Sequence, residues 1–188
     1  MTVSVAEDIL PGHPDRLADA IAERIVDEAV RFDPDAIASI EIALHRDRVF
    51  VTGHVSAGES EPPVIALDEL VRAALEEAGY VGSWAYRPRI AADLTVEPLG
   101  GDDARAARRV SEDQNIVVGH AEGTAATGYL PPVVHAVRAM RRALFALQAE
   151  HPDRLGPDGK VLARFDPRTK PEDPKLVAAL EAALPAAK

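Results

Sequence analysis

Three side chains in this sequence are of types that could bind or stabilise a charged group. His13 and Asp15 stand at the predicted start of a helix, and Lys160 follows Asp158 and Gly159 in a predicted loop. An imidazole can donate a hydrogen bond to an oxygen on which negative charge builds. A carboxylate suits a hard cation, and a lysine is a point charge for a phosphate. Each also has a structural explanation, since the first two could simply cap a helix and the lysine could be solvated.

The composition narrows the chemistry that these side chains could serve. The chain has no cysteine, which excludes disulfides, thiolate zinc sites and cysteine nucleophiles. Any metal ion must therefore be held by oxygen or imidazole ligands, which favours hard ions such as magnesium. The net charge of −10 repels nucleic acid and acidic membranes, so we expect neither as a partner. A polyphosphate ligand would need metal ions and a local group of Lys and Arg to offset that charge.

The length and the N-terminus indicate a folded protein of the cytoplasm. The 188 residues are 47% hydrophobic and 28% charged, a balance typical of globular proteins. No apolar run is long enough to span a membrane, and the first ten residues carry Glu7 and Asp8 rather than the pattern of a signal peptide. We therefore expect a cytoplasmic location and no membrane partner.

Hydrophobic periodicity predicts the elements that must position the candidate side chains. Leu17, Ile21, Ile25 and Ala29 follow at helical spacing from a start at residues 13–15. The other predicted elements are strands at 37–44 and 48–56 joined by a hairpin turn, a helix at 67–78, a strand at 90–96, a mobile loop at 97–115, a helix opened by Pro131 and Pro132, a strand at 161–165 and a helix at 171–184. This order predicts an α+β fold of antiparallel or mixed sheets with helices packed on one face.

Several segments resemble one family in order and spacing. The segment GHPDRLAD at 12–19 resembles the GHPDKxAD signature of methionine adenosyltransferases, the S-adenosylmethionine synthetases. Further segments of that family are similar to EAGY at 77–80, DQ at 113–114, LPP at 130–132 and PDGK at 157–160. Because the agreement covers roughly residues 3 to 166, it is more specific than a match of any single motif. The resemblance implies a first α+β region at 1–115, ending in a mobile loop, and a second, incomplete region at 116–188, each like the repeated domains of that family.

The resemblance also implies an activity and roles for individual residues. The family makes S-adenosylmethionine from ATP and methionine at a site between two subunits, with magnesium and potassium ions. By position, it implies catalytic and ATP-binding roles for His13 and Lys160, further ATP contacts at Asp158, Gly159 and Asp113, a magnesium ligand at Asp15 and a potassium ligand at Glu41.

Other positions depart from the family pattern. The family's glutamate for the methionine amino group aligns with His54, and an imidazole cannot replace a carboxylate for an ammonium group. The family's GxQSPDI loop motif is not recognisable between Val96 and Asp103, and the chain ends before the family's second half. We therefore expect one subunit of a split methionine adenosyltransferase, in a hetero-oligomer with a chain resembling the C-terminal half or, failing that, in a homo-oligomer. The alternative is a non-catalytic relative that binds nucleotide or regulates the enzyme.

Overall fold

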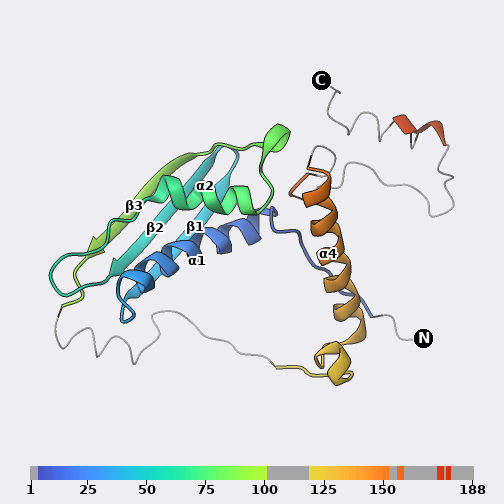
Figure 1. The fold of residues 1–188 in the computed structure, drawn as a ribbon, viewed down its shortest axis with the longest axis horizontal. Coiled ribbons are helices and arrows are strands. Elements are labelled where there is room, and N and C mark those ends of the chain that lie inside the picture. Colours follow the sequence, from blue (N-terminus) through green and yellow to red (C-terminus); the bar gives the residue numbers. More distant parts are fainter. Residues whose placement is uncertain (1–3, 101–118, 153–155, 159–172, 176, 179–188) are drawn as a thin grey trace.

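The computed structural model describes residues 4–100, 119–152, 156–158, 173–175 and 177–178 (Figure 1). Its elements are helix α1 (Pro14–Phe32), strands β1 (Ile37–His45) and β2 (Arg48–Ser56), helix α2 (Leu67–Glu77), the short 3-10 helix η1 (Gly82–Trp84), strand β3 (Arg89–Glu97), the short 3-10 helix η2 (Ala125–Thr127) and helix α4 (Pro132–Glu150). The elements predicted in this part of the chain are confirmed with closely matching ends. Most of the predicted loop at 97–115, the boundary near residue 115, the strand at 161–165 and most of the helix at 171–184 lie outside the described residues.

The three strands form one mixed sheet in the order β1-β2-β3. The β1–β2 hairpin is antiparallel, with Glu41 opposite Thr52, whereas β2 and β3 are parallel, with Thr52 opposite Asp93. Tyr86 fixes the approach to β3, because its hydroxyl donates a 2.5 Å hydrogen bond to the carbonyl of Arg46 in the hairpin turn. The antiparallel and parallel pairings in one sheet, together with the helices, confirm the predicted α+β class with a mixed sheet.

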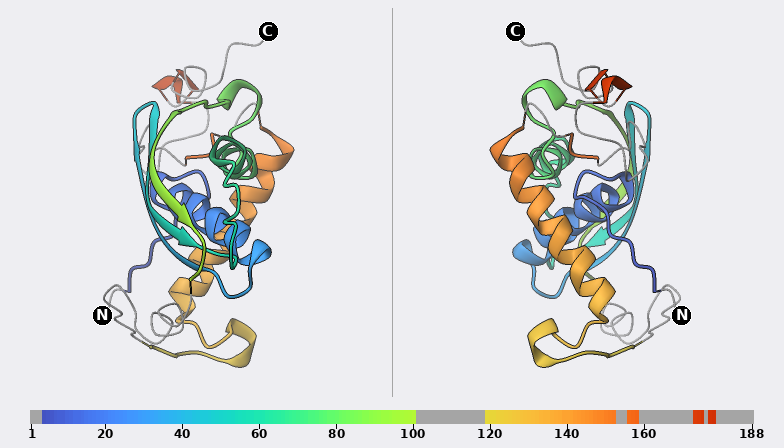
Figure 2. Two further views of the ribbon diagram at one scale, coloured as in Figure 1. Left: turned by 90° about the vertical axis from the view of Figure 1, so that its left-hand side faces the viewer. Right: turned by 90° about the vertical axis from the view of Figure 1, so that its right-hand side faces the viewer.

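Helices α1 and α2 cover one face of this sheet (Figures 1 and 2). The apolar sides of both helices and the inward-facing residues of the strands form one core, with α1 lying mainly against β1. The core consists of Leu17, Ile21, Ile25 and Ala29 of α1, Val49, Val51 and Val55 of β2, Ala57, and Val71, Ala74, Leu75 and Ala78 in and just after α2. Burying a Val, Leu or Ile side chain contributes about 1.5–3 kcal/mol, so this cluster anchors the helix whose first turn carries His13 and Asp15.

The opposite face of the sheet is polar and carries no described helix. Glu41, Thr52 and Asp93 are exposed there in one row across the three strands, and His54 lies in the next row between Ser39 and Thr95. The alternation of side chains along a strand places all of these residues away from α1 and α2.

Helix α4 stands apart from the sheet and runs beside the N-terminal segment (Figure 1). Its C-terminal end reaches the turn after α2, where Gln148 is buried against Gly79. Met140, Leu144 and Leu147 form an apolar stripe that stays exposed, Met140 to 64%. Within the described part of the chain, no helix is both long enough and apolar enough to traverse a bilayer.

Candidate active site

His13 serves as the N-cap of α1. Its Nδ1 accepts a 3.3 Å hydrogen bond from the Asp15 backbone N–H, and Pro14 follows in the first helical turn, where it needs no N–H donor. A neutral imidazole whose Nδ1 accepts must carry its proton on Nε2, so that nitrogen can donate to a ligand. His13 therefore caps the helix through Nδ1, and this capping does not use the Nε2–H that a ligand would need.

The carboxylate of Asp15 is open to solvent at the positive end of the helix. Its side chain is 85% exposed, and its Oδ2 lies 3.9 Å from His13 Nδ1. Magnesium in nucleotide sites is commonly held by one or two carboxylates, water and the phosphates of the substrate. A single exposed carboxylate beside an N-terminal helix turn fits that pattern. Among the described residues, no group of three or more His, Asp and Glu side chains is arranged to hold a metal without such a substrate.

The segment 156–158 lies directly against the turn that precedes α1. Pro157 is fully buried, and the space beside Gly12 is closed by it. A Cβ added at Gly12 would lie 2.7 Å from Pro157 Cβ and still closer to the Pro157 carbonyl. His13 and Asp158 consequently line one cavity, although they come from opposite ends of the sequence. Gly159, Lys160 and Asp113 lie outside the described residues, so their predicted contributions stay predictions.

This cavity has a volume of about 290 Å³, near the lower end of the range for ligand pockets. The N-terminal segment and α4 supply its apolar walls. The described residues that line it are Asp8, Ile9, Leu10, His13, Val137, Met140, Arg141, Leu144 and Asp158.

An ion pair between Asp8 and Arg141 joins the N-terminal segment to α4. Arg141 Nε donates a 2.8 Å hydrogen bond to Asp8, whose side chain is only 12% exposed, and Arg16 lies 3.9 Å from the same carboxylate. Burial by itself raises the pKa of Asp8, but the Arg141 hydrogen bond, the Ile9 N–H and the two arginine charges hold that pKa below its ordinary value. The carboxylate is therefore ionised at neutral pH. Sequence reasoning missed this pair, because its members are 133 residues apart and neither belongs to a motif.

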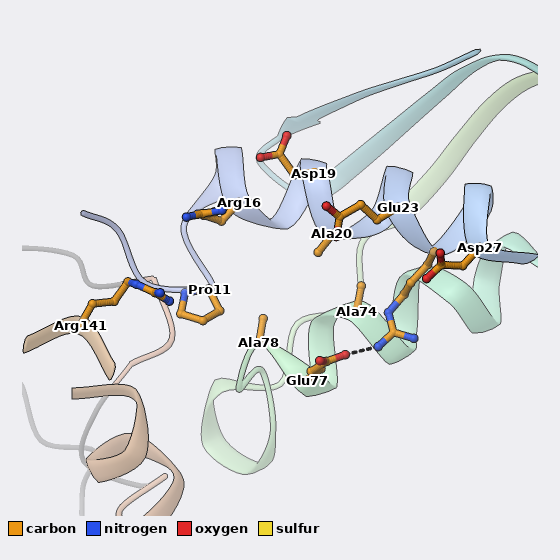
Figure 3. Close-up of a pocket in the computed structure, with 11 residues that line it drawn as sticks. Pro11, Arg16, Asp19, Ala20, Glu23, Asp27, Ala74, Glu77, Ala78 and Arg141 are labelled. Atoms are coloured by element: carbon orange, nitrogen blue, oxygen red, sulfur yellow. Dashed lines mark hydrogen bonds and ion pairs between the residues drawn. The ribbon is translucent and has the colours of Figure 1, made fainter. Parts of the chain in front are cut away.

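A second hollow, of about 420 Å³, lies between α1 and α2 (Figure 3). Acidic side chains of α1 line it, and an ion pair between Arg24 and Glu77 crosses it. Arg16 and Arg141 lie at the end beside Pro11, and Arg141 borders both this groove and the His13 cavity. The arginine of the GHPDR segment is thus directed toward this groove and Asp8.

Glu41 and His54 lie on the polar face of the sheet and do not line the His13 cavity. Glu41 is exposed opposite Thr52, and His54 is half-buried opposite Ser39 and Thr95. Of the predicted residues that the structure describes, His13 and Asp158 therefore line the cavity and Asp15 lies beside His13 without lining it. Glu41 and His54 lie on the polar face of the sheet.

The sequence of this chain is similar to those of S-adenosylmethionine synthetases. Residues 2–92 match the family described as "S-adenosylmethionine synthetase, N-terminal domain". An S-adenosylmethionine synthase of Acholeplasma laidlawii is 29% identical over 82% of this chain and 42% of its own, and one of Corynebacterium urealyticum is 30% identical over 86% and 44%.

The fold is also found in a solved structure. "Structure of an Unusual S-adenosylmethionine synthetase from Campylobacter jejuni" superposes with a TM-score of 0.63 at 24% identity, over 80% of this chain and 38% of that one. The chain spans less than half the length of these relatives. Residues 2–92 thus match the N-terminal domain of the S-adenosylmethionine synthetases, and the chain is similar in sequence to the N-terminal part of these relatives.

Proposed function

We propose that this chain takes part in the synthesis of S-adenosylmethionine from ATP and methionine and supplies part of the ATP site. The observation that carries the proposal is the meeting of the GHPD turn with the Pro157–Asp158 segment around one cavity. Two motifs from distant parts of the sequence, both typical of the family, thereby form a single surface. Such convergence is what a binding site needs, and neither helix capping nor loop solvation requires it.

The side chains at this surface suit the phosphates of ATP. His13 Nε2–H would donate to a phosphate oxygen as negative charge develops on the leaving triphosphate. Asp15 would hold a magnesium ion, which when bound neutralises part of the phosphate charge. Lys160 follows Asp158 by two positions and would add a positive charge, with Gly159 and Asp113 as further ATP contacts. On the polar face of the sheet, Glu41 would serve as a potassium ligand.

A larger assembly is part of this proposal. Stabilising a leaving triphosphate requires several cations, and the chain carries a net charge of −10. The stripe of Met140, Leu144 and Leu147 on α4 is also exposed apolar surface of the kind that partners cover, and two of its members, Met140 and Leu144, line the His13 cavity as well. We propose a hetero-oligomer with a chain resembling the remaining part of the relatives, or else a homo-oligomer. Co-purification of two such chains as one species would support the first arrangement.

The first test is ATP binding, measured by calorimetry with magnesium present. Replacing His13 with alanine is expected to weaken ATP binding about tenfold, because one charge-assisted hydrogen bond is lost. His120→Ala is the matched control, since His120 is an exposed histidine that does not line the His13 cavity. Equal losses in both variants, or no ATP binding by the wild-type protein, would contradict the proposed site.

The second test concerns methionine and separates the enzyme from a non-catalytic relative. His54 offers no negative charge to the ammonium group of methionine, so we expect the chain to show no measurable methionine affinity by itself. His54→Glu restores a carboxylate on the same strand face and is expected to bring methionine binding into the millimolar range.

Each outcome of the His54 test favours one function. A gain of affinity in His54→Glu favours an enzyme whose methionine site has been altered at one position. ATP binding without any methionine binding in either protein favours the nucleotide-binding or regulatory relative. Tight methionine binding by the wild-type chain would overturn the assignment of His54 as the altered position.

A further inference from the structure

Tyr80 connects α2 to the turn that carries His13. Its hydroxyl donates a 2.8 Å hydrogen bond to the carbonyl oxygen of Gly12, across 68 residues of sequence. Burial, followed by the charge of Asp158 and the neighbouring Tyr86, raises the pKa of Tyr80 to about 12. The hydroxyl therefore keeps its proton throughout the physiological range and remains a donor to Gly12.

The position of Tyr80 is fixed from the side of α2. Gly79 ends the helix with φ +97°, a left-handed conformation that favours glycine, and the Tyr80 N–H then bonds to the carbonyl of Leu75 at 2.9 Å. Gln148 of α4 closes the space beside Gly79, and the ring of Tyr86 packs at 5.7 Å from that of Tyr80. The hydroxyl is consequently presented on a well-supported ring.

Gly12 is held from two directions at once. Tyr80 binds its carbonyl oxygen, and Pro157 fills the space beside its Cα. The next residue is His13, whose N–H bonds to Leu10 and whose ring caps α1. A rotation of the Gly12 carbonyl would therefore change both the direction of the His13 ring and the packing of Pro157 against Gly12.

We propose that Tyr80 is a positioning residue of the ATP site, holding the Gly12–His13 turn and the Pro157–Asp158 segment in register. This inference rests on the proposed function, because it assigns Tyr80 a role in a site that His13 and Asp158 form. Tyr80 itself contacts the Gly12 carbonyl and does not line the His13 cavity. It acts on the ligand only through the groups that it orients.

The chain contains a matched control for this role. Tyr86 also donates its hydroxyl to a backbone carbonyl, that of Arg46, but in the β1–β2 hairpin turn. Tyr80→Phe and Tyr86→Phe therefore each remove one hydroxyl-to-carbonyl hydrogen bond and keep the ring. Both are expected to lower the melting temperature by a similar small amount. Only Tyr80→Phe is expected to weaken magnesium–ATP binding, by about three- to tenfold, measured well below the melting temperature.

A double-mutant cycle shows whether Tyr80 acts through His13. The variant His13→Ala with Tyr80→Phe should lose less ATP affinity than the sum of the two single losses, because one of the two groups that Tyr80 orients is then absent. Equal affinities of Tyr80→Phe and Tyr86→Phe, or fully additive losses in the double variant, would overturn the inference. Failure of the proposed function looks different, since the wild-type protein would then not bind ATP or His13→Ala would bind it as tightly as the wild type.

Discussion

Gly12→Ala is expected to weaken ATP binding by about tenfold or more while leaving the sheet and its two helices folded. The added Cβ would lie 2.7 Å from Pro157 Cβ and closer still to backbone atoms of Pro157. Backbone atoms cannot rotate away as the end of a flexible side chain can. The Pro157–Asp158 segment must therefore move off the His13 turn, and Asp158 leaves the cavity.

Gly100→Ala is the control for this experiment. A Cβ at Gly100 meets no atom of the described residues within 4 Å, and neither glycine has a positive φ, so the two variants differ in available space and not in backbone strain. Calorimetric ATP titrations and far-UV circular dichroism on both variants measure binding and folding separately. Wild-type affinity in Gly12→Ala would mean that the contact with Pro157 is irrelevant to the site.

Local patterns were sufficient to predict the elements of the fold. The spacing of Leu17, Ile21, Ile25 and Ala29 predicted α1, and their complete burial confirms which side of that helix faces the core. Alternation along 48–56 predicted β2 and its inward valines in the same way. These predictions succeed because the periods of helices and strands are properties of short segments.

Contacts between distant segments were not predictable in this way. The parallel pairing of β3 with β2, the ion pair of Asp8 with Arg141 and the hydrogen bond of Tyr80 to Gly12 all depend on how separate elements come together. The family resemblance implied ATP contacts for both His13 and Asp158. Tyr80 ends the EAGY segment at 77–80, but that resemblance implied no role for it in supporting their turn. The same limit explains why His13 was left with two explanations, since only the structure shows that His13 caps α1 through Nδ1 and also lines the cavity.

Ile25→Ala is expected to lower the free energy of unfolding by about 2–5 kcal/mol. Ile25 lies in the middle of α1, is fully buried, and packs in the cluster formed with α2 and the inward side of the sheet. Truncation removes apolar contacts and leaves a cavity that the surrounding helices can close only in part. Because small domains are stable by about 5–15 kcal/mol in total, the loss should be clear in urea denaturation followed by circular dichroism.

Val30→Ala on the same helix is the control, because Val30 is 43% exposed and its truncation creates no internal cavity. We expect a change in the free energy of unfolding of less than about 1 kcal/mol in that variant. Similar losses in both variants would show that α1 does not pack on the sheet through the side that Ile25 occupies.

Ile25→Ala and Gly12→Ala should also separate the stability of the fold from the geometry of the site. Ile25 supports α1 from beneath, so its truncation lowers ATP binding only through the fraction of molecules that unfold. At temperatures well below the transition that fraction is small, and the affinity of Ile25→Ala should stay near that of the wild type. Gly12→Ala should show the reverse, with a changed affinity and an almost unchanged unfolding transition. The core beneath α1 would then hold the start of this helix in place. Pro157 and Tyr80 would fix the Gly12 turn and so the geometry that the ligand meets.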